Sequence, residues 1–293
     1  MAQGKRHGLQ QDRAGNALSE AVALRDGDLQ AMVARAVRGG DCCLAYQPIV
    51  QARRPNPVAF HEALIRVLDE TGRIIPAGSF MAEVEDSEIG RVLDCRALDM
   101  GFDALRAEPG LRLAVNVSAR SIGYPDWLDL LDRHLRHDPG LGERLILEVT
   151  ESSIMRVPEL VATFMRRMQS RGVSFAIDNF AAGATNLRLL STFQFDIMKI
   201  DGAMIRGAAA DADRQVLLRA ILAIAAEFDM FTVAETVERP DDALFLEELG
   251  LDCLQGYFFG APTITPPWHG AATSGPQNQP RRSVYFFEQS LAT

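Results

Sequence analysis

The chain alternates between short apolar runs and longer segments in which apolar residues recur every three or four positions. A short apolar run bounded by turn residues is typical of a strand buried on both faces. Eight such runs lie between residues 43 and 260, with the sequences CLAYQPIV, VAFHEALIRV, LRLAVNVS, RLILEVTES, VSFAIDNF, FDIMKIDG, FTVAETVE and CLQGYFFG. These runs predict eight strands.

Helical patterns separate most of the runs. The clearest covers residues 158–170, because Pro158 stands in its first turn and Gly172 follows its end. Residues 213–228 and 240–249 repeat the pattern, and residues 17–38 predict an amphipathic lead-in helix that ends at Gly39. Strand–helix alternation of this length predicts a (β/α)8 barrel of about 225 residues.

The first two strands are joined differently from the others. The stretch between them, QARRPNP, is too short for a helical crossover and predicts a hairpin, so one barrel strand runs against the rest. The predicted fold class is α/β, a modified TIM (β/α)8 barrel with one antiparallel strand. A doubly wound open sheet is the alternative, although no glycine-rich phosphate loop follows the first strand. The expected organisation is a partly helical N-terminal extension (1–40), the barrel (41–267) and a C-terminal tail (268–293) that contains an apolar patch at 284–287.

Composition narrows the class of protein. The 293 residues are 47% hydrophobic and carry a formal net charge of -9, which argues against a surface that binds a nucleic-acid polymer. No secretory signal and no apolar stretch of membrane-spanning length are visible, so we expect a cytoplasmic protein that does not insert into a membrane. The four cysteines lack metal-ligand spacing and are expected to be reduced, buried hydrophobes: Cys42, Cys43, Cys95 and Cys253.

Acidic and amide residues stand at or just past the ends of the apolar runs. A carboxylate in such a place is costly to desolvate unless it is paired or binds a metal ion. Each one alone could be a helix cap or a turn residue, but their repetition at strand after strand suggests oxygen ligands gathered at one rim of the barrel. The series is Glu62, Asn116, Glu148, Glu151, Asp178, Asp201 and Glu235.

Oxygen ligands without a histidine or cysteine cluster favour Mg²⁺ or Mn²⁺ over zinc. Two such ions a few ångströms apart are a common device for hydrolysing phosphodiesters. Lys199, inside the strand-like run IMKIDG, is expected either to pair with the carboxylates or to hold an attacking water.

The sequence resembles the EAL-domain family of cyclic-di-GMP phosphodiesterases over roughly residues 42–265. The resemblance rests on an ordered series of motifs: Gln47-Pro48-Ile49, Glu62-Ala63-Leu64-Ile65-Arg66, Asn116-Val117-Ser118, Glu148-Val149-Thr150-Glu151, Asp178-Asn179-Phe180, Lys199-Ile200-Asp201, Ala234-Glu235-Thr236-Val237-Glu238 and Gln255-Gly256-Tyr257. It implies hydrolysis of cyclic-di-GMP to linear pGpG with one or two Mg²⁺ or Mn²⁺ ions. By analogy with the family, we expect a homodimer.

The resemblance also implies residue roles. Ligands of the first metal would be Glu62, Asn116, Glu148 and Asp178, and Asp178 would also bridge to a second ion. Lys199 would orient the nucleophilic water and Glu235 would assist as general base or second-metal partner. Glu151, together with Thr185, would brace the loop after residue 180. The dinucleotide pocket would be lined by Gln47, Arg66, Asp201, Glu238 and Gln255.

Several positions depart from the family pattern. Asn179 replaces the second aspartate of Asp-Asp-Phe-Gly, which removes an anion from the second metal site. Ala181 replaces a glycine and would be strained if that position requires positive φ, and Thr236 replaces the glycine of the Ala-Glu-Gly-Val-Glu element. The leading hypothesis is therefore a phosphodiesterase with reduced activity. The alternative is a catalytically degenerate EAL domain that binds cyclic-di-GMP as a receptor or acts through a protein partner.

Overall fold

The structure, a computed structural model, describes residues 28–183, 187–266 and 268. Within them the chain forms nine strands: β1 (Cys42–Gln51), β2 (Val58–Leu68), β3 (Ile74–Pro76), β4 (Leu113–Asn116), β5 (Leu145–Thr150), β6 (Ser174–Phe180), β7 (Ile197–Ile200), β8 (Phe231–Ala234) and β9 (Cys253–Gln255). All eight predicted strands are confirmed. The additional strand, β3, is a three-residue extension that pairs with the end of β2.

Eight strands close into a barrel. The order around it is β1-β9-β8-β7-β6-β5-β4-β2, and β1 pairs with β2 to complete the ring. Strand β1 runs antiparallel to both of its neighbours, whereas the pairs from β2–β4 round to β8–β9 are parallel. The predicted hairpin and the predicted barrel with one antiparallel strand are both confirmed.

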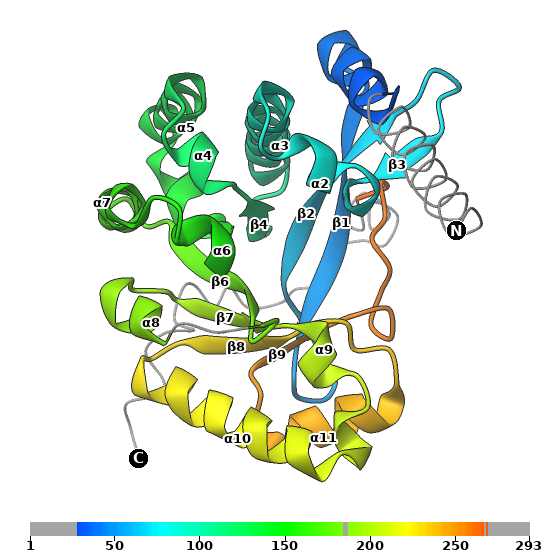
Figure 1. Ribbon diagram of the computed structural model, residues 1–293, viewed down its shortest axis with the longest axis vertical. Helices are drawn as coiled ribbons and strands as arrows, with labels where there is room; N and C mark the ends of the chain where they lie inside the picture. Colours follow the sequence, from blue (N-terminus) through cyan, green and yellow to red (C-terminus); the bar gives the residue numbers. More distant parts are fainter. Residues whose placement is uncertain (1–27, 184–186, 267, 269–293) are drawn as a thin grey trace, which may run out of the picture.

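Helices cover the outside of the barrel, as Figure 1 shows for α3, α5, α7 and α10. Residues 28–39 are also helical. The helices that follow are α2 (Met81–Val84), α3 (Glu88–Ala107), α4 (Ala119–Ile122), α5 (Pro125–His137), α6 (Glu151–Ile154), α7 (Pro158–Gln169), α8 (Arg188–Thr192), α9 (Gly202–Ile205), α10 (Ala212–Glu227) and α11 (Pro240–Leu249). The predicted helices at 158–170, 213–228 and 240–249 are α7, α10 and α11. Among the described residues, no helix has the length and apolarity needed to cross a bilayer.

The barrel interior is layered because side chains alternate between the two faces of a strand. One apolar layer takes a single residue from every barrel strand: Ile49, Phe60, Ala114, Ile146, Ala176, Ile197, Val233 and Cys253. A larger apolar core fills the space between the sheet and the surrounding helices. The inner layer is the floor on which the functional residues stand.

One expectation about the cysteines was wrong. All four are free thiols, but only Cys253 is buried, whereas Cys42, Cys43 and Cys95 are half-buried. The strand ends and the outer face of α3 leave the other three thiols partly open to solvent. The apolar patch at 284–287 lies outside the described residues, as does the beginning of the predicted lead-in helix.

Candidate active site

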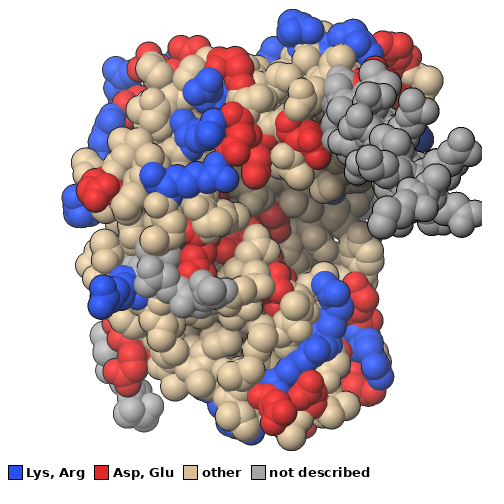
Figure 2. Space-filling view, in the orientation of Figure 1, with Lys and Arg blue, Asp and Glu red and all other residues tan. Residues whose placement is uncertain are grey.

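A polar layer lies directly above the apolar layer of the barrel. It is reached by moving two positions along each strand, towards the rim at which the parallel strands end. One residue from each strand, or from just past its end, makes up this layer: Gln47, Glu62, Asn116, Glu148, Asp178, Lys199, Glu235 and Gln255. Figure 2 shows acidic side chains in the hollow at the centre of this face. The residues predicted from separate strands are therefore brought together by the register of the barrel.

Lys199 lies at the centre of the polar layer. Its Nζ is 2.7 Å from a carboxylate oxygen of Glu148 and 3.0 Å from one of Glu235. The corresponding distances are 3.1 Å to Glu62 and 3.3 Å to Asp178. The lysine side chain is only 1% exposed and the four carboxylate side chains are 0–17% exposed. The ammonium group thus neutralises part of a buried acidic cluster, as one of the two sequence-based alternatives predicted.

The cluster carries a surplus of negative charge. Four ionised carboxylates and one ammonium sum to a charge of −3, which is unfavourable in a buried site. Burial raises the pKa of Glu148 well above its usual value, and the neighbouring Glu62 carboxylate adds to this effect. Burial also raises the pKa of Glu235, to about 7, although Lys199 opposes the shift. The site therefore demands protons or cations.

The pKa values of Glu62 and Lys199 are shifted in the directions that favour their charged forms. Burial disfavours the charged form of Glu62, but Lys199 and hydrogen bonds from Gln255 and Asn116 hold its pKa below the usual value. Burial likewise disfavours the ammonium form of Lys199, but the surrounding carboxylates, Asp178 foremost, raise its pKa well above normal. The surroundings of Glu62 and Lys199 thus favour the charged form of each group.

Amide side chains fix the orientation of the Glu62 carboxylate. Asn116 Nδ2 donates to Glu62 Oε1 at 2.8 Å, and Gln255 Nε2 donates to Glu62 Oε2 at 2.6 Å. Gln255 also donates to Gln47 Oε1 at 3.2 Å, and Gln47 in turn donates to the carbonyl of Gly260 at 3.1 Å. This chain of hydrogen bonds links residues of β4, β2, β9 and β1. It therefore connects the antiparallel strand β1 and its two neighbours to the Glu62 carboxylate.

The residues present fit a divalent cation. Among the described residues, Glu148 Oε1 and Gln255 Oε1 are buried without a hydrogen-bond donor, and Asp178 Oδ1 has only the ion-pair contact of 3.3 Å with Lys199 Nζ. The donor set is carboxylate and amide oxygen, which suits Mg²⁺ or Mn²⁺. Among the described residues, no group of three His, Cys, Asp or Glu side chains has metal-ligating geometry, and four of the carboxylates contact Lys199 Nζ. A bound cation would satisfy the donor-free oxygens of Glu148 and Gln255 and would neutralise the surplus carboxylate charge.

Three non-glycine residues beside the cluster have positive φ. Asn179 has φ 56°, Ala181 has φ 68° and Thr236 has φ 55°. Asparagine tolerates this region, whereas alanine and especially a β-branched residue are strained in it. Ala181 therefore meets the condition under which strain was predicted from the sequence. Thr236 is strained in the same way, and its side chain fills the space beside the Cα of Gly202.

The Asn179 side chain contacts one carboxylate of the acidic cluster. Its Nδ2 donates a hydrogen bond to Asp178 Oδ2 at 2.9 Å. An aspartate at position 179 would instead place a second carboxylate beside Asp178. The amide therefore satisfies an oxygen that would otherwise be open to a cation.

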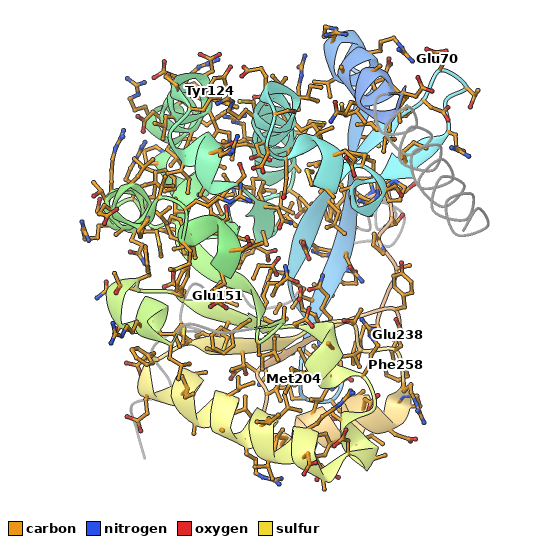
Figure 3. The ribbon with its side chains drawn as sticks, viewed as in Figure 1. Glu70, Tyr124, Glu151, Met204, Glu238 and Phe258 are labelled. Carbon is orange, nitrogen blue, oxygen red and sulfur yellow. The ribbon has the colours of Figure 1, made fainter. Side chains whose placement is uncertain are left out.

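The remaining predicted residues lie outside the cluster. Arg66 donates to the carbonyl of Ile65 at 3.0 Å, and Asp201 caps α9 by accepting from the Ala203 amide at 2.8 Å. Glu238 is exposed beyond β8. Glu151 is the first residue of α6, and Figure 3 shows it well apart from Glu238. Thr185 lies outside the described residues.

Sequence patterns missed one half-buried carboxylate that supports the site. Asp94, in α3, accepts from the backbone N–H of Ser118 at 3.1 Å and from Ser121 Oγ at 2.6 Å. It thereby anchors the chain just after Asn116. Burial raises the pKa of Asp94. Its place in a helix between two apolar neighbours gives no sign of this role in the sequence.

The chain is similar in sequence to known proteins over most of its length. The sequence profile described as "EAL domain" matches residues 30–262, so the chain belongs to the EAL domain family. Its curated relatives include MucR of Pseudomonas aeruginosa, named a bifunctional diguanylate cyclase/cyclic di-GMP phosphodiesterase, which is 33% identical over 75% of this chain and 33% of the relative. NbdA of the same organism, named a cyclic di-GMP phosphodiesterase, is 31% identical over 78% of this chain and 30% of the relative. The chain spans about a third of the length of these relatives.

Solved structures agree with the fold. A MucR phosphodiesterase in complex with c-di-GMP matches with a TM-score of 0.71 at 28% identity, over 83% of this chain and 99% of that one. The EAL domain of FimX from Pseudomonas aeruginosa, bound to c-di-GMP, matches with a TM-score of 0.74 at 20% identity, over 81% and 97% of the two chains. The second likeness concerns the fold alone.

Proposed function

We propose that this protein is a metal-dependent phosphodiesterase that hydrolyses cyclic-di-GMP to linear pGpG, with reduced turnover. The observation that carries the proposal is the buried cluster at the barrel rim, in which four carboxylates surround Lys199 and still leave Glu148 Oε1 without a donor. Membership of the EAL domain family and the names of MucR and NbdA support the choice of substrate.

In this proposal Glu62, Asn116, Glu148 and Asp178 would hold the first Mg²⁺ or Mn²⁺. Asp178 and Asn179 would hold a second ion, and the Asn179 amide is a weaker ligand than a carboxylate. When bound, such ions lower the pKa of a water ligand and neutralise charge on the phosphoryl oxygens.

The chain's own residues then hold and move protons. Lys199, fixed by its ion pairs, donates a hydrogen bond that orients the attacking water. Glu235, 3.0 Å from Lys199, accepts a proton from that water, and its raised pKa suits this task near neutral pH. The nucleotide would lie against Gln47, Arg66, Asp201, Glu238 and Gln255. Glu151 would brace the loop after β6 together with Thr185.

A second candidate function is binding without cleavage. It is favoured by the hydrogen bond from Asn179 to Asp178 Oδ2 and by the strained Ala181 and Thr236 on either side of the cluster. A receptor of this kind would hold cyclic-di-GMP and signal to a protein partner. We further propose a homodimeric cytoplasmic protein with a barrel domain over 41–267, preceded by an extension over 1–40 and followed by a tail over 268–293.

The test is incubation of the purified full chain with cyclic-di-GMP and Mn²⁺ or Mg²⁺, followed by chromatography for pGpG. Glu62→Gln keeps the shape of the side chain and removes its charge, and Glu159→Gln is the matched control because Glu159 is exposed on α7. Product from the wild type and Glu159→Gln but not from Glu62→Gln supports the phosphodiesterase. Nucleotide retained without product supports the receptor, and the absence of both binding and product contradicts both.

A further inference from the structure

A cavity of about 460 Å³ opens at the other end of the barrel, where the parallel strands begin. Its floor is the underside of the apolar layer, including Phe60, Ile146 and Cys253. Its walls come from residues two positions further from the active-site rim: Gln51, Val58, Arg112, Ser174, Phe231 and Leu251. The cavity therefore occupies the place of a third layer of side chains.

An open third layer is unusual for this architecture. The interior of a closed eight-stranded barrel is filled by packed side-chain layers and is not a pore. Here Val58 is 51% exposed at the cavity edge, and serine takes the inward position at the start of β6. An apolar cavity of about 150 Å³ accepts one benzene ring, so this one has room for about three aromatic rings.

The chain itself carries a segment of matching chemistry. Residues 284–288 read Val-Tyr-Phe-Phe-Glu, which joins three consecutive aromatic residues to one carboxylate. The aromatic residues match the apolar floor, and the glutamate matches Arg53 and Arg112, which line the cavity. The segment is in reach. Trp268 packs 4.8 Å from Tyr46, ring centre to ring centre, and the cavity begins about 17 Å further along β1, at Gln51. Residues 269–283 can span up to about 50 Å.

We propose that residues 284–288 dock in this cavity and fill the space that the described residues leave open at the end where the parallel strands begin. The segment then supports the apolar layer, which in turn supports the carboxylates and Lys199 two positions above. The proposal is independent of whether the barrel hydrolyses or only binds its nucleotide.

The first test uses trypsin, because Arg281 and Arg282 precede the segment and only Ser283 separates them from it. A docked segment keeps the following residues out of the protease, and cleavage tracks the undocked fraction. Val58→Asp places a charge at the cavity edge on a side chain that is already half exposed. Val216→Asp is the matched control, since Val216 is 60% exposed on α10, away from the cavity. We expect Val58→Asp to speed cleavage at these arginines about tenfold or more, as loss of a docked-to-free ratio of ten would do. Equal rates in Val58→Asp, Val216→Asp and wild type would overturn the proposal.

The second test measures how accessible the cavity floor is to an alkylating reagent. Cys253 lies in the cavity floor, and burial raises its pKa to about 12, so its alkylation is slow while the cavity is filled. The double variant Phe286→Asp/Phe287→Asp should speed alkylation of Cys253 and leave the alkylation rate of the half-buried Cys95 unchanged. Peptide mass spectrometry measures both rates. Leu291→Asp, in the same tail, is the control. Three results would overturn the proposal: an unchanged Cys253 rate, protection that is lost on dilution (which would mean a second copy supplies the segment), or protection that is lost when a co-purified small molecule is removed.

Discussion

Replacing Lys199 with methionine removes the cation that four buried carboxylates share. At separations of 2.7–3.3 Å, each attraction is worth roughly 5 kcal/mol before desolvation at an effective dielectric constant of about 20. Most of this gross attraction offsets the cost of burying the charges. The net loss on removing one partner of a buried ion pair is about 3–5 kcal/mol. We therefore expect Lys199→Met to lower the free energy of unfolding by that amount at pH 8 in EDTA.

Two conditions should reduce the loss. Acidification lets the carboxylates take up protons, so the difference between Lys199→Met and wild type shrinks as the pH falls towards 5. A saturating divalent cation replaces the missing charge directly and stabilises the variant more than the wild type, because binding to the folded state alone raises stability by mass action. At about 2–4 °C per kcal/mol for a domain of this size, the loss in EDTA corresponds to roughly 10 °C in melting temperature.

The assay is urea unfolding followed by circular dichroism at pH 8 and pH 5.5, with EDTA or with Mn²⁺. Arg35→Met is the matched control, because Arg35 forms an exposed ion pair with Glu70 whose loss costs at most about 1 kcal/mol. If Lys199→Met is no more destabilised in EDTA than Arg35→Met, the ammonium does not hold the cluster together. If Mn²⁺ stabilises both variants equally, the carboxylates are not the metal site.

Three further predictions concern the same rim. Asn179→Asp should raise pGpG formation about 10–100-fold at limiting Mn²⁺, because it restores an anion beside Asp178; no gain even at saturating Mn²⁺ would show that the strained loop limits turnover. Thr236→Gly should be more stable than Thr236→Ala by about 1 kcal/mol in urea unfolding, because only the alanine keeps a Cβ at φ 55°; equal stabilities would mean that the backbone is not strained there. For Glu148 and Glu235 the folded pKa lies above the unfolded value, so the metal-free protein should lose stability as the pH rises from about 5 to above 7, whereas saturating Mg²⁺ should flatten this slope; a metal-free stability that rises over this range would contradict the shifts.

Sequence reasoning found the barrel because its signals are local. Each strand is a short apolar run that ends in a polar residue, and the seven-residue link QARRPNP is too short to carry the chain across a sheet. The same pattern placed Glu62, Glu148, Asp178 and Lys199 at one rim, since parallel strands share their direction. The resemblance to the EAL family then supplied roles that spacing alone does not contain.

Features that depend on how the strands and helices pack in the closed barrel could not be predicted from the sequence. Nothing in the run IMKIDG shows that Lys199 meets four carboxylates, because the number of partners follows from barrel register. The cavity beneath Cys253 depends on how eight strands meet, and the role of Asp94 depends on the packing of α3 against the chain after β4. The positive φ of Thr236 is a backbone property that the residue type argues against, so the sequence did not predict it.

The chemistry of residue 199 explains why it is a lysine. The chain has 30 lysines and arginines, and only Lys5 and Lys199 are lysines, so the composition otherwise favours arginine strongly. A guanidinium is a planar fork that matches one or two carboxylates, whereas an ammonium is a compact charge with three rotatable donors. Four carboxylates from β2, β5, β6 and the end of β8 converge on a single point 2.7–3.3 Å away, which only the compact group can occupy. The internal ammonium offsets part of the acidic charge in the absence of metal, and the carboxylate charge that it does not offset leaves the site ready to attract a divalent cation.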